Sequence, residues 1–164
     1  MTNEQEIAIL EILEHNAQVS PAEIAALVGL TAEEVEAAIQ RFEEAKVIRG
    51  YGALVDWDRL GTDRIYAFID VRVRPQHDVG FDAIGQEIAL FDEVHSLYLM
   101  SGQHDFLVVV EGRTLREVAT FVAEKLAPLQ GVESTATSFV LKKYKLEGQI
   151  LGEEGEDWRL PVAP

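Results

Sequence analysis

The segment 31–45, TAEEVEAAIQRFEEA, carries side chains that can exchange hydrogen bonds with the edges of nucleic-acid bases. If it forms a helix that enters a DNA groove, its outward positions are Ala32, Glu33, Glu36, Ala37 and Gln40, with Arg41 following. A glutamate can accept a hydrogen bond from the cytosine amino group. Beside a phosphate, the same carboxylate is repelled by about 1 kcal/mol at about 4 Å in a water-like dielectric. The positions therefore favour base reading, and the charge of the segment opposes it.

A helix-turn-helix over 20–49 would hold these side chains in place. Ser20 to Glu23 and Thr31 to Glu34 each have the composition of a capping box that starts a helix. Ala25 is small enough for a close helix crossing, and Gly29 can adopt the left-handed conformation that the turn requires. Helical spacing over three helices predicts an interior made of Ile7, Ile9, Leu10, Ile12, Leu13, Ala17, Ile24, Leu27, Leu30, Val35, Ile39 and Phe42. A plain three-helix bundle with the same turn is the alternative.

Beyond residue 64 the helical spacing gives way to strict alternation. Residues 65–73 alternate apolar with polar or aromatic side chains, which predicts a strand. Further strands are expected over 94–100, 106–111 and 132–146, and helices over 79–89 and 115–126. This β-α-β-β-α-β order predicts a ferredoxin-like domain, and with it an α+β fold class. The face without helices, bearing Tyr66, Phe68 and a threonine-rich last strand, needs a partner, so we expect self-association.

The turn-rich segment DWDRLGTD, residues 56–63, indicates the boundary between the two domains. We expect a helix-turn-helix domain of the winged type at 1–56, in which 48–55 has strand composition. A linker at 57–63 would follow, then the ferredoxin-like domain at 64–146. Residues 147–164 are expected to form an acidic C-terminal tail.

The net charge of −15 is concentrated at the two ends of the chain. Residues 1–50 hold ten acidic and three basic side chains, and non-specific attraction to nucleic acid depends on Lys and Arg. A solvated, solubilising surface is the default interpretation of this charge. The chain has no cysteine, which excludes disulfides and thiolate sites. No membrane-spanning run or signal peptide is recognisable, so we expect a cytoplasmic protein without membrane contact.

No arrangement of residues suggests catalysis. The four histidines, at 15, 77, 95 and 104, show no metal-ligand spacing, and the HExxH motif is absent. There is also no phosphate-binding loop and no G-x-S-x-G nucleophile motif. The sequence therefore predicts no metal, no cofactor and no enzymatic activity.

Taken together, these features resemble the Lrp/AsnC (feast/famine) family of bacterial and archaeal regulators, from about Ile7 to Tyr144. The resemblance rests on RFEEAKVIRGYGALVDWDRLG after the helix-turn-helix, SGQHDFLVVVEG in the second domain and GVESTATSFVLKKYK at its end. It implies a transcriptional regulator that binds double-stranded DNA. It also implies a ferredoxin-like domain, the RAM domain, that binds a small-molecule effector such as an amino acid or a related metabolite. Family members form homodimers and commonly octamers, with the effector between dimers.

Carried over position by position, the resemblance places the effector site on Ser101, Gly102, His104, Asp105, Thr135 and Thr137. Asp105 would accept hydrogen bonds from the ammonium group of a zwitterion. Backbone N–H groups of the Ser101–Gly102 turn would donate to its carboxylate. The alternative for Gly102 and Asp105 is a structural turn in which the aspartate caps its own backbone. The two threonines are equally compatible with ordinary strand positions.

The chain departs from the family in the recognition helix. Where relatives commonly place Arg or Lys, it has Glu36, Ala37, Ala38 and Gln40, and of the basic cluster only Arg41 remains. Octameric assembly would offset weak single contacts through avidity. We therefore predict an effector-controlled DNA-binding regulator.

Two other functions remain open. The first is a metabolite-binding oligomer whose helix-turn-helix serves for packing or protein contact. The second is an enzyme similar to the siroheme decarboxylases, which share the two-domain layout. Their anionic tetrapyrrole would require basic side chains, here Arg72, Arg74, Arg113 and Arg116.

Overall fold

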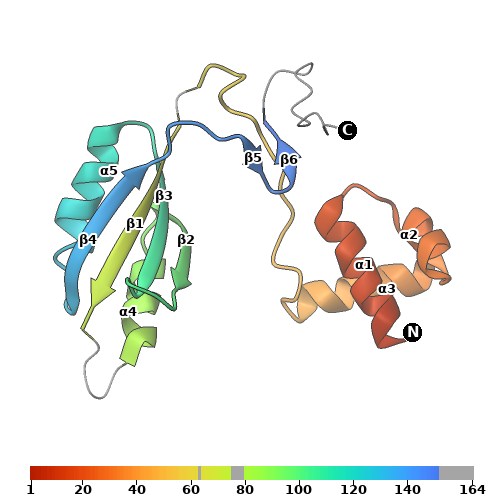
Figure 1. Ribbon diagram of the computed structural model, residues 1–164. Helices are drawn as coiled ribbons and strands as arrows, with labels where there is room; N and C mark the ends of the chain where they lie inside the picture. Colours follow the sequence, from red (N-terminus) through yellow and green to blue (C-terminus); the bar gives the residue numbers. More distant parts are fainter. Residues whose placement is uncertain (63, 75–79, 152–164) are drawn as a thin grey trace, which may run out of the picture. The chain divides into compact units, whose positions relative to one another are not determined.

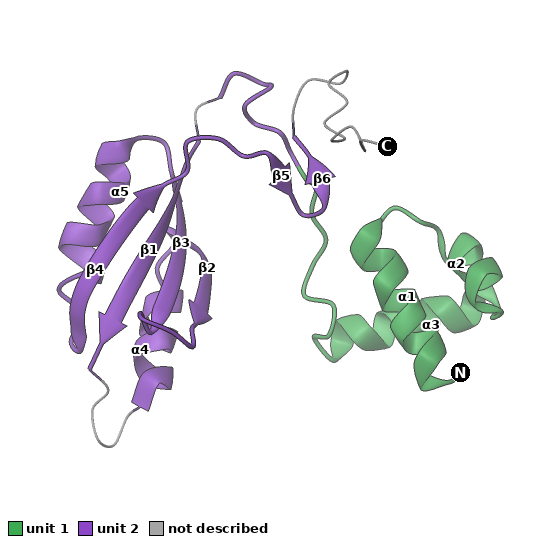
Figure 2. Ribbon diagram, in the orientation of Figure 1, with its two compact units in different colours: residues 1–54 green, residues 55–164 purple. Residues whose placement is uncertain are grey.

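The computed structural model describes residues 1–62, 64–74 and 80–151, which form two compact units. Unit 1 is Met1–Leu54 and unit 2 is Val55–Pro164 (Figure 2). Across the described ranges, the helices are too short or too polar to cross a membrane. Each unit has its own hydrophobic core.

Unit 1 consists of three helices, α1 (Asn3–His15), α2 (Pro21–Val28) and α3 (Ala32–Glu44) (Figure 1). The two predicted capping boxes are confirmed, since Ser20 and Thr31 accept hydrogen bonds from the backbone N–H groups of Glu23 and Glu34. Gly29 ends α2 at φ 70°, the left-handed conformation expected of the turn. The helix-turn-helix thus forms where local chemistry predicts it.

The core of unit 1 is narrower than the predicted interior. Its fully buried side chains are Ile9, Ile24, Val35 and Ala38. Leu27 is 71% exposed, because α2 buries the face that bears Ile24 and Ala25 and residue 27 points away from it. Ile7 is 47% exposed for the same reason, since α1 packs through Ile9 and Leu13. The predicted interior positions of Leu27, Ile7 and Ala17 were wrong, since Ala17 is also exposed and lies beyond the end of α1.

The strand considered for 48–55 is not present in the described chain. Helix α3 is closed instead by Lys46 at φ 58°, and the N–H groups of Val47 and Ile48 donate to the carbonyl of Phe42. The chain then continues without regular secondary structure to a turn at 57–61. Unit 1 contains only helices among its described elements, so this apolar segment has no strand edge to pair with.

Unit 2 is a four-stranded antiparallel sheet with helices on one face (Figure 1). Along the chain, its elements are β1 (Ile65–Val73), α4 (Gly80–Ala89), β2 (Val94–Leu99), β3 (Phe106–Gly112), α5 (Leu115–Phe121), the π-helical turn η1 (Val122–Leu126) and β4 (Val132–Phe139). The strand order is β2-β3-β1-β4. This arrangement confirms the ferredoxin-like βαββαβ fold and the α+β class.

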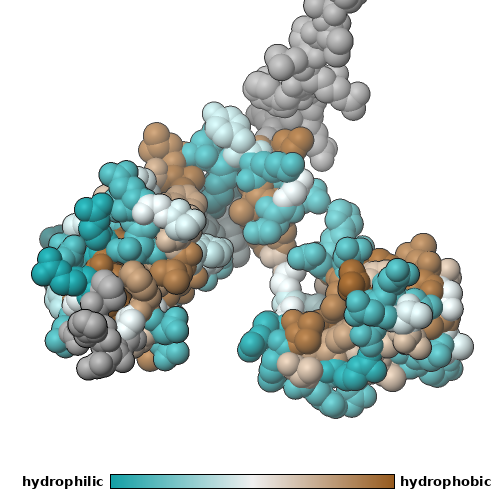
Figure 3. All heavy atoms as spheres, turned by 60° about the horizontal axis from the view of Figure 1, so that its bottom comes forward, coloured by the Kyte–Doolittle hydropathy of each residue, from teal (hydrophilic) through white to brown (hydrophobic). Residues whose placement is uncertain are grey.

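The alternation of β1 divides unit 2 into a buried and an open side of the sheet. Ala67, Ile69 and Val71 are fully buried against the helices. Tyr66 and Phe68 lie on the opposite side, and Phe68 is 41% exposed. Hydrophobic atoms reach the surface of both units (Figure 3).

The end of unit 2 differs from the predicted long last strand and tail. Strand β4 stops at Phe139, and a separate hairpin of β5 (Lys145–Leu146) and β6 (Gln149–Ile150) follows. Its two turn residues, Glu147 and Gly148, both have positive φ, as a tight hairpin turn requires. The first residues of the expected tail therefore belong to this hairpin. The remainder, 152–164, lies outside the described residues.

Candidate functional sites

The first candidate site is the exposed side of α3. The helix packs on the core through Val35, Ala38 and Phe42, so the side chains opposite to them point outward. This outward stripe consists of Glu33, Glu36, Ala37, Gln40 and Glu44. It holds four of the six predicted DNA-contacting residues. Ala32 is half-buried at the start of the helix and Arg41 lies on its flank.

Ala38 does not belong to this surface. Its side chain is completely buried between α3 and the rest of the unit 1 core. The prediction that position 38 replaces a basic DNA contact was therefore wrong, because a Lys or Arg here would have to enter the core. The exposed positions at which the resemblance leads one to expect a cation, and this helix has none, are 36, 37 and 40.

Most of the acidity of α3 is engaged within the protein. Glu34 accepts a hydrogen bond from the N–H of Thr31 at 2.9 Å, and this bond lowers the pKa of its carboxyl. Glu43 accepts from the Tyr51 hydroxyl at 2.8 Å; partial burial and this bond raise the pKa of Tyr51. Glu44 accepts from Gln40 at 3.0 Å.

Glu33 and Glu36 remain as the carboxylates of the stripe for which the described chain provides no partner. Glu33 lies in the first turn of α3, where the helix dipole favours a carboxylate. Glu36 lies one turn further along, beyond most of this effect. Of the acidic side chains of α3, Glu36 therefore gains the least from contacts within the protein or from the helix dipole.

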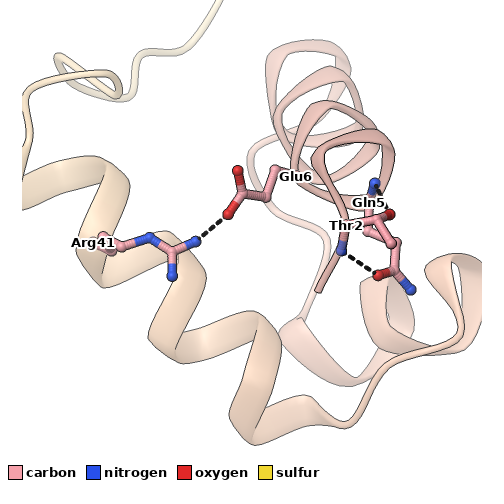
Figure 4. Close-up of polar contacts among 4 residues, drawn as sticks. All are labelled: Thr2, Gln5, Glu6 and Arg41. Atoms are coloured by element: carbon pink, nitrogen blue, oxygen red, sulfur yellow. Dashed lines mark hydrogen bonds and ion pairs between the residues drawn. The ribbon is translucent and has the colours of Figure 1, made fainter.

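The only basic side chain of α3 is held by α1. Arg41 donates from Nη2 to Oε1 of Glu6 over 2.6 Å, and Figure 4 shows the two side chains meeting across the gap between the helices. The guanidinium also lies 5.5 Å from the centre of the Phe42 ring. The cation predicted to contact DNA is thus partly neutralised by an intramolecular partner.

The second candidate site is the turn between β2 and β3. Asp105 closes it, since its carbonyl accepts from the N–H of Met100 at 2.8 Å and its own N–H donates to Val71 at 3.0 Å. The side chain of Asp105 accepts from the N–H of Val73 at 2.9 Å through Oδ2. Asp105 therefore has a structural role, and it caps a neighbouring strand instead of its own backbone.

Two residues of β1 that are outside the predicted effector-binding set lie against this turn. Arg72 donates to the carbonyl of Gln103 at 2.9 Å, and Asp70 Oδ1 lies 3.7 Å from His104 Nδ1. Both belong to the open side of the sheet, together with Tyr66 and Phe68. The sequence marks the two residues, because they are charged positions that continue an otherwise aromatic face, but it does not specify their contacts with the turn.

The turn also presents unused hydrogen-bonding groups. Ser101 and Gly102 are exposed, and within the described chain their N–H groups have no acceptor. Asp105 Oδ1 likewise has no donor among the described residues. A side chain at Gly102 would meet open space, and this glycine is not held in the left-handed region. Packing within one chain therefore does not explain the glycine.

Thr135 and Thr137 do not lie with the turn. Thr135 pairs with Val71 and Thr137 with Ile69, so both threonines project on the helix-covered side of the sheet. The open side of β4 carries Ser134, Ala136 and Ser138, which pair with Arg72, Asp70 and Phe68. The prediction that the threonines lie on the open face was wrong. The composition of a strand does not specify which of its residues project on which side of the sheet; the register with β1 does.

Asp105 gives a direct test of the capping role. Asp105→Ala is expected to destabilise unit 2 by about 1–3 kcal/mol, since it leaves the buried N–H of Val73 without an acceptor. Asp105→Asn keeps an acceptor oxygen and should stay close to the wild-type stability. Urea unfolding followed by circular dichroism measures both. Equal unfolding midpoints for Ala and wild type would show that the capping bond is not made.

The other two histidines in the described part of the chain, His15 and His95, belong to no cluster of metal-ligating side chains. His15 ends α1, His95 lies on β2, and His77 lies outside the described residues. In the described part of the chain, no three His, Asp or Glu side chains are grouped so that they could hold a metal ion.

Two sequence families match this chain. Residues 2–49 match the winged helix-turn-helix DNA-binding domain, and residues 66–150 match the Lrp/AsnC ligand binding domain. An uncharacterised HTH-type transcriptional regulator of Bacillus subtilis, YugG, is 43% identical over 162 residues, 98% of each chain. The leucine-responsive regulatory protein of Rhizobium meliloti is 30% identical over 145 residues, 88% of this chain and 92% of that protein.

Solved structures share the fold. A transcriptional regulator of Neisseria meningitidis, solved as a complex with L-methionine, is 25% identical with a TM-score of 0.69. The match covers 93% of this chain and 97% of the other. AsnC of Escherichia coli matches with a TM-score of 0.66 at 23% identity, over 89% of this chain and 96% of the other, which shows the fold alone.

Proposed function

This chain belongs to the Lrp/AsnC family of transcriptional regulators, and from that premise we propose that it binds duplex DNA through α3 under the control of an amino-acid effector. The observation that carries the DNA-binding part is the outward stripe of α3. It is exposed, it lies on the second helix of a helix-turn-helix whose turn contains Gly29, and it includes side chains that can recognise bases. Gln40 can pair with adenine, and Glu36 can accept from cytosine.

Binding should depend on few phosphate contacts. Unit 1 is acidic, its recognition helix has one cation, and that cation is paired with Glu6. Affinity then comes from base contacts and from several modules engaging one DNA molecule. The expected signature is specific binding with a shallow dependence on salt.

A second copy of the chain is the expected partner of the open side of the sheet. Phe68 and Tyr98 are exposed there, at 41% and 52%, with half-buried Leu107 and Val109 between them. An apolar sheet face of this kind is normally covered. Dimers, and octamers built from them, would give the avidity that a weak single module needs.

The unused groups of the β2–β3 turn support an amino acid as the effector. The N–H groups of Ser101 and Gly102 can donate to its carboxylate, while Asp105 Oδ1 can accept from its ammonium. The regulator from Neisseria meningitidis was solved with L-methionine. In this chain Asp105 would serve the turn with one oxygen and the ligand with the other. Thr135 and Thr137 project on the helix-covered side of the sheet, so within one chain they do not contribute to such a site.

The DNA-binding proposal is tested by fluorescence anisotropy with the DNA upstream of the protein's own gene, at low and moderate salt. Specific binding with a shallow salt slope supports it. If no genomic fragment binds at low salt, with or without amino acids, DNA binding is excluded. An effector-binding oligomer that uses its helix-turn-helix for protein contact would then replace it.

The effector is tested by thermal shift against the amino acids, including L-methionine and L-leucine. One of them should raise the melting temperature of the wild type, and Asp105→Asn should abolish this rise because it removes the charge and keeps the turn. Asp82→Asn is the matched control, because it removes the same charge from an exposed position on α4. It should respond like the wild type. An unchanged response of Asp105→Asn would place the ligand elsewhere.

A further inference from the structure

We infer that Glu6 is a positioning residue that holds Arg41 on the protein and thereby lowers the affinity of unit 1 for DNA. The two residues come from different helices, and their side chains meet over 2.6 Å (Figure 4). This inference rests on the proposed DNA binding by α3. It identifies a residue outside the helix-turn-helix as a determinant of that binding.

The position of Arg41 on α3 indicates which part of DNA it can reach. The stripe of Glu33, Glu36 and Gln40 points away from the core, and Arg41 lies to one side of it, toward α1. When a helix enters the major groove, its central stripe faces the bases and its flanks face the sugar-phosphate walls. Arg41 is therefore placed for a phosphate contact.

A phosphate can reach the guanidinium of Arg41, but the guanidinium is already hydrogen-bonded to Glu6. Its side chain is 54% exposed, and one of its donors is occupied by Glu6. A phosphate approaching Arg41 meets the Glu6 carboxylate as well, and the two anions repel each other. Binding must either displace Glu6 or share the guanidinium with it.

The backbone around Glu6 is fixed in a position from which its carboxylate can compete with a DNA phosphate for Arg41. The start of α1 is closed by the capping box of Thr2 and Gln5, and the Gln5 amide donates to the carbonyl of Val28 on α2 at 3.1 Å. Glu6 itself donates its N–H to the carbonyl of Thr2 at 3.1 Å. The backbone beneath the carboxylate is thus fixed relative to the helix-turn-helix. Exposed ion pairs are weak enough to be broken by a stronger partner, so Glu6 restrains Arg41 without removing it from use.

Four variants measured by fluorescence anisotropy over a series of salt concentrations test this role: Glu6→Gln, Arg41→Gln, the double variant and Glu4→Gln. Glu4 is the matched control, because both glutamates are in the first turn of α1 and only Glu6 contacts Arg41. We expect Glu6→Gln to bind about five-fold more tightly at low salt, because releasing Arg41 to a phosphate adds one attraction of about 1 kcal/mol. Its log–log salt slope should steepen by about 0.9, one additional phosphate contact.

The double variant isolates the coupling between the two residues. In the Arg41→Gln background, Glu6→Gln should change affinity no more than Glu4→Gln does. Equal effects of Glu6→Gln and Glu4→Gln in the wild-type background would overturn the inference. Weaker binding by Glu6→Gln would also overturn it, since Glu6 would then orient Arg41 toward DNA. If neither the wild type nor any variant binds DNA, the proposed function itself fails, and the inference fails with it.

Discussion

Glu36→Lys is expected to tighten binding to duplex DNA by about ten- to thirty-fold at low salt. On non-specific DNA, where Glu36 makes no cytosine contact, the substitution removes one repulsion by the phosphates that line the groove and adds one attraction, each about 1 kcal/mol at about 4 Å in a water-like dielectric. Glu36 is exposed on the outward stripe and has no partner in the described chain, so the exchange breaks no contact. Protein stability should stay within about 0.5 kcal/mol of the wild type.

The measurement is the dissociation constant at two or more salt concentrations. Glu36→Gln should lie between the wild type and Glu36→Lys, because it removes the repulsion without adding a cation. Glu11→Lys is the control for net charge, since it makes the same reversal on exposed α1, away from the outward stripe. If Glu11→Lys tightens binding as much as Glu36→Lys, the effect is general charge and α3 does not face the DNA.

The second large effect concerns the stability of the DNA-binding unit. Ile24→Ala is expected to destabilise unit 1 by about 2–5 kcal/mol, the range for truncating a fully buried aliphatic side chain. Unit 1 has only Met1–Leu54 with which to form a core. Domains of this size bury a smaller share of their surface than larger domains do, and they are marginally stable. The loss is therefore enough to unfold a large fraction of unit 1 and to abolish DNA binding.

Hydrogen exchange followed by mass spectrometry resolves the two units. In Ile24→Ala, the amides of α1, α2 and α3 should lose protection, and those of β1 and β3 should keep it. Leu27→Ala, on the same short helix, is the control, because Leu27 is largely exposed and its truncation should leave protection unchanged. Retained protection throughout unit 1 in Ile24→Ala would show that its core does not depend on this contact.

The parts of the fold that were predictable depend on neighbours in sequence. The capping boxes at Ser20 and Thr31 involve residues three apart, and the alternation of β1 reports its own two faces. The errors arose where a distant element decides the outcome. Leu27 is exposed because of how α2 sits on α1 and α3, and the side taken by Thr135 depends on its register with β1.

The same limit applies to the candidate sites. The outward residues of α3 follow from helical periodicity, so four of them were predictable. The pairing of Glu6 with Arg41 joins residues 35 apart, and the contact of Arg72 with Gln103 joins residues 31 apart. No local pattern specifies either contact. Asp105 was recognisable as a turn residue, but its acceptor role toward Val73 required knowledge of the strand pairing.

Helix α3 separates the residues that maintain its structure from those that would meet DNA. Val35, Ala38 and Phe42 pack on the core, while Thr31 and Glu34 close its start. The side chains of the outward stripe neither pack on the core nor cap the helix, and within the described chain their one hydrogen bond is that between Gln40 and Glu44. The DNA sequence that this fold prefers can therefore change rapidly in evolution, because substitutions that alter which bases are recognised do not destabilise the helix-turn-helix.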